Sequence, residues 1–123
     1  MKRILFISAF PPNRKTAGQN YSRQLLNELS EKYNVDLICF KYEDHNVEIN
    51  NSINILRIFQ LSKIDKCLNF VKLIFIHPFF TVRFNFNLLY FLIRNSYKYD
   101  ILYFDFSQVF IYSVFIKHKY KIL

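Results

Sequence analysis

The sequence predicts an α/β domain whose core is a Rossmann-like, doubly wound parallel sheet. Short apolar runs alternate along the chain with segments in which apolar residues recur every three or four positions, the spacing of an amphipathic helix. One of these runs, Ile101–Phe104, is continuous, as in a central parallel strand that is buried on both faces. The first run is followed by a loop and a helix start, an arrangement that aims backbone N–H groups at an anion.

The first unit is a strand, a loop and a helix. We expect the apolar run Arg3–Phe10 to form a buried strand that ends at the pair Pro11-Pro12. Thr16 and Gln19 have the Thr-x-x-Gln spacing of a capping box, so the helix should begin there. Residues at helical spacing are expected to face the sheet: Tyr21, Leu25, Leu26, Leu29 and Tyr33.

The rest of the chain continues the alternation. Further strands are expected at Val35–Phe40, Ile53–Ile58, Ile101–Phe104 and Tyr120–Leu123, with a polar loop over Lys41–Asn51. Helices are expected over Ser62–Ile76, over a segment with the apolar positions Phe86, Leu89, Tyr90, Ile93 and Tyr97, and over Val109–Ile116. The last strand has no crossover helix after it, so we expect a single domain, residues 1–123, that is incomplete at its C-terminus.

Composition and charge limit the kind of protein this is. With 123 residues, of which 52% are hydrophobic, the chain is one domain at most and too apolar to be a disordered tail. Its net charge of +8 favours an anionic partner, or else marks a solvated basic surface. The basic residues are scattered, so no nucleic acid partner is expected. The longest uncharged run, Phe106–Ile116, is far shorter than the roughly 20 residues of a membrane span, so any membrane contact would be peripheral.

The cysteines and histidines predict neither disulfides nor a metal site. Cys39 lies in an expected strand and Cys67 in an expected helix, without the spacing of paired ligands. We therefore expect reduced, buried thiols and a cytoplasmic protein. His45, His77 and His118 also lack partners at ligand spacing, so no metal is expected. The N-terminal apolar run is short and no small-x-small cleavage site follows it, which argues against a signal peptide.

Several segments, taken together, resemble the opening of glycosyltransferase family 4. They are Lys2–Ser8, Pro11-Pro12, Ala17-Gly18-Gln19 with Arg23, Leu26 and Leu29, Val35-Asp36-Leu37, and Tyr99–Leu102. Enzymes of this family have the GT-B architecture, in which two Rossmann-like domains face a cleft. They move a sugar from a nucleotide-sugar donor to an acceptor, commonly in polysaccharide or glycolipid assembly. The resemblance covers the whole chain but only the first part of such an enzyme.

The resemblance implies an N-terminal, acceptor-side domain whose substrates are a nucleotide-sugar and a glycan or lipid-linked acceptor. It implies no cofactor other than the nucleotide-sugar donor. The expected location is cytoplasmic, either free or at the inner face of the membrane. A second Rossmann-like domain, encoded downstream, would hold the donor, so the isolated chain is expected to be inactive. The alternative is a small basic anion- or membrane-binding module without catalysis. A dinucleotide-dependent oxidoreductase is disfavoured because the chain has a single glycine and no Gly-x-Gly-x-x-Gly pattern.

The first group of candidate site residues lies on the loop before the first helix. Family members usually carry two adjacent glycines there, near the donor phosphate and sugar, and this chain has Ala17-Gly18. The amides of Gly18 and Gln19 either face such a ligand or belong to a helix cap without one. Arg14 and Lys15 either attract an acceptor phosphate or a lipid headgroup, or are solvated loop charges.

The second group follows the expected central strand. Asp105 and Ser107 lie at its carboxyl edge, where open α/β sheets bind ligands. Family members often have a histidine nearby that contacts the transferred sugar, and this chain offers Asp105 instead. Asp105 either bonds a sugar hydroxyl or acts as a base, or it caps the next helix. Arg83 is a candidate for an acceptor anion or a surface charge, and the basic Ser62–Ile76 helix with Phe79-Phe80 is a candidate for membrane contact.

Overall fold

The computed structural model describes residues 1–60 and 85–123, apart from the side chain of Ser107. Within these ranges the elements are β1 (Arg3–Ser8), α1 (Ala17–Lys32), β2 (Asn34–Phe40), β3 (Asn54–Phe59), α3 (Phe86–Asn95), η1 (Ser96–Lys98), β4 (Ile101–Asp105), η2 (Ser107–Val109), α4 (Tyr112–Phe115) and β5 (Lys121–Ile122). The expected helix Ser62–Ile76 lies outside the described residues, as do Cys67, His77, Phe79-Phe80 and Arg83.

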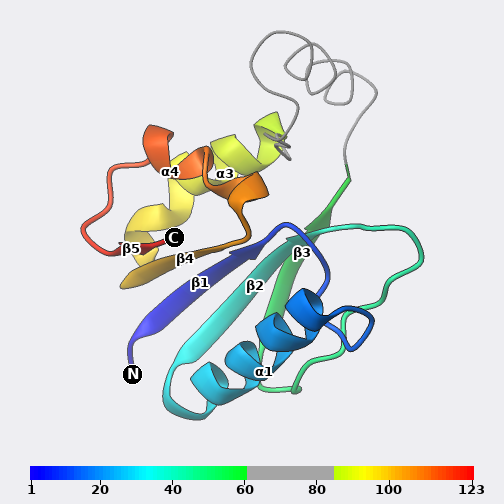
Figure 1. The fold of residues 1–123 in the computed structure, drawn as a ribbon. Helices are drawn as coiled ribbons and strands as arrows, with labels where there is room; N and C mark the ends of the chain where they lie inside the picture. Colours follow the sequence, from blue (N-terminus) through cyan, green and yellow to red (C-terminus); the bar gives the residue numbers. More distant parts are fainter. Residues whose placement is uncertain (61–84) are drawn as a thin grey trace, which may run out of the picture.

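The strands form a five-stranded parallel sheet in the order β3-β2-β1-β4-β5, with β1 at its centre. Helix α1 covers one face, and α3 with α4 covers the other (Figure 1). The two cores follow from the alternation of side chains along β1. Ile4 and Phe6 pack on the α1 side, whereas Leu5 and Ile7 pack on the α3 side. The predicted Rossmann-like α/β fold is confirmed.

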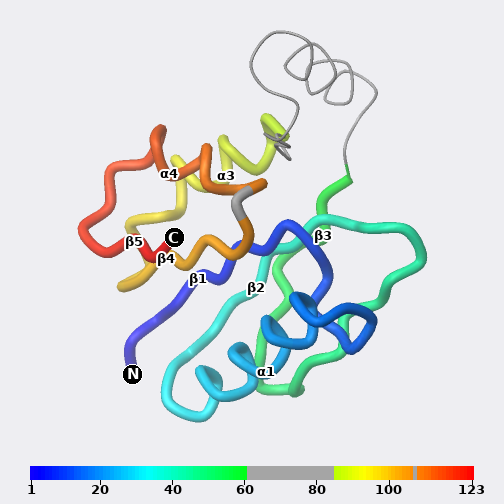
Figure 2. The backbone as a smooth tube through the Cα atoms, in the orientation of Figure 1, coloured from blue at the N-terminus to red at the C-terminus, as the bar shows by residue number. Residues whose placement is uncertain are grey.

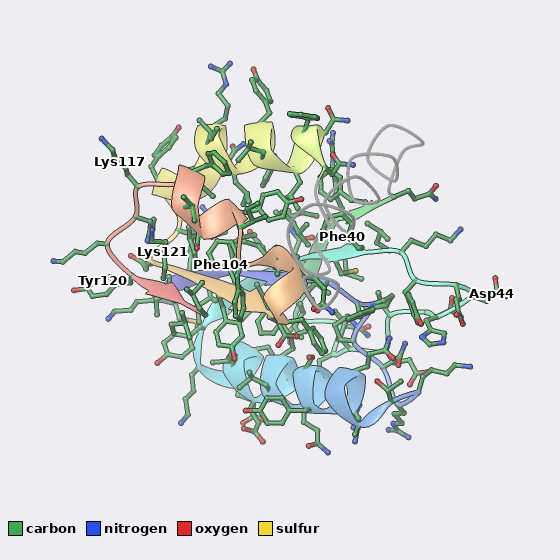
Figure 3. All side chains as sticks on the ribbon, turned by 45° about the horizontal axis from the view of Figure 1, so that its top comes forward. Phe40, Asp44, Phe104, Lys117, Tyr120 and Lys121 are labelled. Atoms are coloured by element: carbon green, nitrogen blue, oxygen red, sulfur yellow. The ribbon has the colours of Figure 1, made fainter. Side chains whose placement is uncertain are left out.

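The view with all side chains shows the same layering (Figure 3). Phe40 and Phe104, from β2 and β4, lie in the middle of the molecule and are almost fully buried. Asp44, Lys117 and Tyr120 lie at its periphery, on loops. The core of the α3 side is thus built around the central strands, as the apolar runs predicted.

Several element boundaries differ from those predicted. The first strand ends at Ser8 rather than Phe10, because the chain turns there and brings the Phe10 carbonyl within hydrogen-bonding distance of the Ser8 hydroxyl (2.8 Å). The last predicted helix is reduced to η2 and the short α4. Its hydrogen bonds, such as Val109 N–H to the Phe106 carbonyl (3.3 Å), span three residues rather than four, the pattern of tight turns. The last strand is limited to Lys121–Ile122.

The predicted buried face of α1 is wrong at its first position. Tyr21 is 62% exposed, whereas Gln19, Ser22 and Leu26 are buried. Leu25 and the later apolar residues are partly buried against the core. The first turns of α1 therefore turn a polar face inward, which a search for apolar periodicity overlooks.

The predicted face of α3 is also wrong. Leu88 and Leu92 are the buried residues of this helix, and four of the five residues expected on one apolar face are exposed: Phe86, Tyr90, Ile93 and, in η1, Tyr97. The N-cap Asn85 fixes the orientation. Its side chain accepts from the backbone N–H groups of Asn87 and Leu88, while its own N–H donates to the Tyr112 hydroxyl (2.7 Å).

The amino edge of the sheet is held by a cluster around Asp36. Its carboxylate pairs with Arg3 (3.3 Å) and accepts from the Tyr99 hydroxyl (2.7 Å), which joins β2 to β1 and to the segment before β4. The Arg3 guanidinium also lies over the Tyr99 ring, and the Arg3 N–H donates to Asp100 (2.7 Å). Burial and the hydrogen bond to Asp36 raise the pKa of Tyr99 above its usual range. These contacts stabilise the amino edge of the sheet.

The described residues do not meet the requirements of a membrane span, a metal site or a reactive thiol. Among the helices of residues 1–60 and 85–123, none combines the length and apolar character needed to cross a membrane. In the same ranges, no three His, Cys, Asp or Glu side chains gather as they would around a metal ion. Cys39 is fully buried, as predicted, and burial raises the pKa of its thiol to about 12. It is therefore an unreactive core residue.

Candidate functional site

The candidate site lies at the carboxyl edge of the sheet, between β1 and β4. From β1 the chain continues to β2 on one side, and from β4 it continues to β5 on the other. This is a topological switch point, the place where open α/β sheets bind ligands. The β1–α1 loop and the β4–η2 turn meet there (Figure 1).

Asp105, the last residue of β4, connects three elements at this point. Its carboxylate accepts hydrogen bonds from the hydroxyls of Ser8, at the end of β1 (3.2 Å), and Ser22, in the second turn of α1. The backbone of Phe106 contributes a further hydrogen bond. Asp105 is only 9% exposed, and no cation among the described residues forms an ion pair with it. A buried carboxyl group thus depends on neutral donors alone.

The chemistry of this cluster makes Asp105 easier to protonate than a solvated aspartate. Burial raises the pKa of Asp105, and the hydrogen bonds from Ser22, Ser8 and the Phe106 backbone oppose that rise only in part. Each serine has one hydroxyl hydrogen but two acceptors within reach. Ser8 also lies near the Phe10 carbonyl (2.8 Å), and Ser22 near the Gly18 carbonyl (3.1 Å). A proton on Asp105 would supply a further donor to this group. The site therefore holds a carboxyl group that is a stronger base than a solvated aspartate.

Gly18 lies in the first turn of α1, where it contacts the aromatic ring of Phe106. A Cβ added to Gly18 would lie 3.0 Å from Phe106 Cε1. Phe106 has a φ of 70°, the left-handed region, and its ring also meets the Phe10 ring edge-on at 4.9 Å. Gly18 does not itself need a positive φ. The single glycine of the chain is thus explained by close packing against Phe106, whether or not a ligand also approaches its exposed backbone.

Gln19 is almost fully buried, and both its backbone and its side chain form hydrogen bonds. Its backbone N–H donates to the Thr16 hydroxyl (3.2 Å), which confirms the predicted cap, so of the two alternatives for this amide the structure shows the helix cap. The side-chain Nε2 donates to the Pro11 carbonyl (2.9 Å) and lies 3.2 Å from His45 Nδ1. Its Oε1 accepts from the Thr16 hydroxyl rather than from the Thr16 backbone. Gln19 therefore fastens the Pro-Pro loop to α1 and to the β2–β3 loop.

The structure brings only some of the predicted residues together. Asp105 and Gly18 share a partner in Ser22, and Gln19 follows on the same turn. Arg14 and Lys15 are exposed on the same loop, where the Lys15 N–H donates to the Asn13 side chain (2.9 Å). Arg83 and the side chain of Ser107 lie outside the described residues.

Sequence reasoning missed the two serines that hold Asp105. Ser8 is the first polar residue at the end of an apolar run, and Ser22 lies between Gln19 and Leu26 on the inward face of α1. A polar residue on the buried face of a helix is a signal that it has a buried polar partner. The partner itself is remote, since 83 residues separate Ser22 from Asp105.

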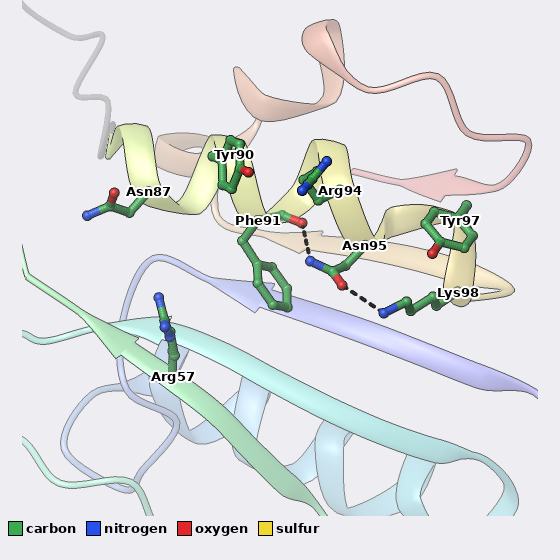
Figure 4. Close-up of a pocket in the computed structure, with 8 residues that line it drawn as sticks. All are labelled: Arg57, Asn87, Tyr90, Phe91, Arg94, Asn95, Tyr97 and Lys98. Atoms are coloured by element: carbon green, nitrogen blue, oxygen red, sulfur yellow. Dashed lines mark hydrogen bonds between the residues drawn. The ribbon is translucent and has the colours of Figure 1, made fainter.

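A larger groove lies elsewhere, between β3 and α3 (Figure 4). It has a volume of about 600 Å³, and Asp105 and Gly18 do not line it. Its cationic residues are Arg57, Arg94 and Lys98, and no acidic residue is among those that line it. Lys98 donates to Asn95 (3.0 Å), which donates to the Phe91 carbonyl (2.9 Å). The groove is suited to an anion, but it does not include the switch point.

Comparisons with known proteins do not identify a family. A scan of protein-family models found no match, and searches of curated proteins and of solved structures found none either.

We expect Asp105→Asn to remove a pH dependence of stability. Because the folded-state pKa is raised, the stabilising contribution of the protonated acid is complete below about pH 3.8 and is lost as pH rises through the folded pKa. Urea unfolding of both proteins should be measured between about pH 3.5 and 8, which begins near the usual pKa of a carboxyl group. The free energy of unfolding of the wild type should fall relative to that of the variant as pH rises. Asp44→Asn, at an exposed position, is the control. A difference between wild type and Asp105→Asn that stays constant with pH would contradict the assignment.

The contact between Gly18 and Phe106 predicts a coupled pair of substitutions. Gly18→Ala should gain up to about 1 kcal/mol of helix propensity, but in the wild type the close Phe106 ring offsets this gain. In a Phe106→Ala background the ring is absent, so the same substitution should stabilise the protein. The free energies of unfolding of the four proteins give the coupling as a double-mutant cycle. Equal effects of Gly18→Ala in both backgrounds would show that the contact does not constrain this position.

Proposed function

We propose that this chain is the N-terminal, acceptor-side domain of a GT-B glycosyltransferase. In this proposal a sugar passes from a nucleotide-sugar donor to a polysaccharide or glycolipid acceptor. The observation that carries it is the meeting of a helix N-terminus and a buried carboxyl group at the switch point between β1 and β4. The resemblance of the β1–α1 segment to glycosyltransferase family 4 supports the same function.

The N-terminus of α1 supplies the electrostatic part of the proposal. The helix is 16 residues long and has no acidic residue in its first turn. Its positive end is therefore not neutralised locally and favours a phosphate of the donor or acceptor. Gly18 is exposed on this turn, so a ligand can approach the backbone there. In the proposal the first turn of α1 faces the cleft between two domains.

Asp105 supplies the acid–base part of the proposal. The acceptor hydroxyl attacks the anomeric carbon of the donor, and the bond between that carbon and the nucleotide phosphate breaks. Asp105 is ionised before the transfer and takes the hydroxyl proton, and burial, which raises its pKa, makes it a stronger base for this step than a solvated aspartate. Ser8 and Ser22 hold the carboxylate in place for this step. The donor is held by a second Rossmann-like domain encoded downstream.

The test is reconstitution. The chain should show no turnover alone, and co-expression with a second Rossmann-like domain encoded downstream should give sugar transfer from one of UDP-glucose, UDP-N-acetylglucosamine, UDP-galactose or GDP-mannose. In the pair, Asp105→Asn should lower turnover by about 100-fold or more, the usual contribution of a general base. The exposed Asp44→Asn is the matched control. Turnover by the chain alone, or full turnover of the Asp105→Asn pair, would refute the proposal.

A second candidate is a basic anion- or membrane-binding module without catalysis, and the groove between β3 and α3 favours it. Three cations line the groove, and exposed Tyr90 and Tyr97 lie beside Arg94 and Lys98. This candidate predicts binding to phosphatidylglycerol vesicles that weakens steeply with salt, and that Arg94→Gln with Lys98→Gln reduces strongly. Co-sedimentation measures both effects, with phosphatidylcholine vesicles as the control. Binding that is unaffected by these substitutions would eliminate the groove as the site.

A further inference from the structure

A second polar pocket lies beside α1, away from Asp105. It has a volume of about 230 Å³ and is formed by three segments: the β1–α1 loop, the middle of α1, and the β2–β3 loop. The residues that line it are Arg14, Arg23, Asn27, Glu48, Ile49 and Asn50. Figure 2 shows the β1–α1 loop beside the chain that leads from β2 to β3.

The walls of this pocket are fixed by hydrogen bonds between the segments. The Glu48 N–H donates to the Pro12 carbonyl (2.9 Å), and the Asn50 N–H donates to the Asn27 side chain (3.0 Å). Asn13 donates to the Asn46 carbonyl (2.9 Å). Val47 and Ile49 are packed against the core on the α1 side, which anchors the loop from within. The backbone segments around the pocket are therefore held together without a ligand.

The charged side chains that line the pocket do not form ion pairs with one another. Among the described residues, neither arginine forms an ion pair, and Glu48 forms none either. Arg23 donates from Nε and Nη2 to the Asn20 side chain (3.1 and 2.9 Å), which orients its guanidinium and leaves further N–H groups available. Two guanidinium groups and one separate carboxylate thus face the same small space.

From this arrangement we propose that the pocket binds a single sugar unit that carries one phosphate or carboxylate group. Guanidinium groups match the planar, bidentate geometry of these anions, so Arg14 and Arg23 would hold the charged group. Glu48 accepts hydrogen bonds from hydroxyl groups, and the free N–H groups of Asn27 and Asn50 side chains donate to them. The volume is smaller than the roughly 300 Å³ at which drug-sized ligand sites begin, which suits one ring.

This site goes beyond the proposed transfer reaction and does not rest on it. Binding requires neither a donor domain nor Asp105. Failure of the reconstituted transfer would leave the pocket intact, and failure of binding by the isolated chain would leave the switch point intact. The two proposals can therefore be rejected separately.

Calorimetric titration of the full chain tests the pocket with four probes: glucose 6-phosphate, glucuronate, glucose and inorganic phosphate. We expect saturable binding of at least one of the anionic sugars, and binding at least about tenfold weaker for both glucose and inorganic phosphate. Each charged hydrogen bond contributes roughly 1.5–3 kcal/mol, so Arg14→Gln and Arg23→Gln should each weaken binding about 10- to 100-fold. The preference between glucose 6-phosphate and glucuronate identifies the anionic group.

Two further variants separate a built site from a basic surface. Glu48→Gln should reduce the advantage of the anionic sugar over inorganic phosphate, because the carboxylate contacts hydroxyl groups and repels a bare anion. Lys32→Gln makes the same charge change as Arg23→Gln at the far end of α1 and should leave binding unchanged. Thermal unfolding confirms that each variant is folded. An equal loss with Lys32→Gln, phosphate binding as tight as that of the sugars, or no saturable binding of any probe would overturn the proposal.

Discussion

A carboxyl group buried at the middle of a sheet edge must be given hydrogen-bond donors, and the position of those donors decides how the surrounding elements meet. In this protein Asp105 is supplied by Ser8 from the central strand and by Ser22 from the helix that crosses over it. The angle at which α1 begins is therefore linked to the end of β4, although α1 packs mainly on the opposite side from α3 and α4. The close contact between Gly18 and Phe106 follows from the same approach of α1 to the β4–η2 turn.

The two edges of the sheet differ in how the charge of an aspartate is balanced. At the amino edge, Asp36 has a cationic partner in Arg3 and a hydroxyl donor in Tyr99, so its charge is balanced. At the carboxyl edge, Asp105 is buried without a cation among the described residues. An uncompensated charge of this kind reduces the stability of the folded state, and proteins usually retain such groups where they have a task. The contrast supports placing function at the carboxyl edge and structural closure at the amino edge.

The sheet could be predicted because apolar runs and turns are local properties of the sequence. The runs at β1 and β4 are continuous, the run at β2 is interrupted only by Asp36, and the structure pairs them as parallel neighbours. The faces of the helices were less predictable. In α3, apolar residues lie all around the helix, so periodicity alone could not choose Leu88 over Tyr90 as a core residue. That choice depends on the cap at Asn85 and its contact with Tyr112, 27 residues away.

The candidate site, too, could be predicted from the sequence only in part. Asp105 and Gly18 could be found from their places after a strand and at a helix start, but Ser8 and Ser22 become partners of Asp105 only through the fold. The pocket beside α1 combines residues from three segments for the same reason. The loop that completes it is bound along residues 46–50 to the β1–α1 loop and to α1, whereas its turn at Glu43 and Asp44 is exposed. Insertions that lengthen the chain should therefore be tolerated at that turn and rejected a few residues later, where added length would separate the segments that the loop joins.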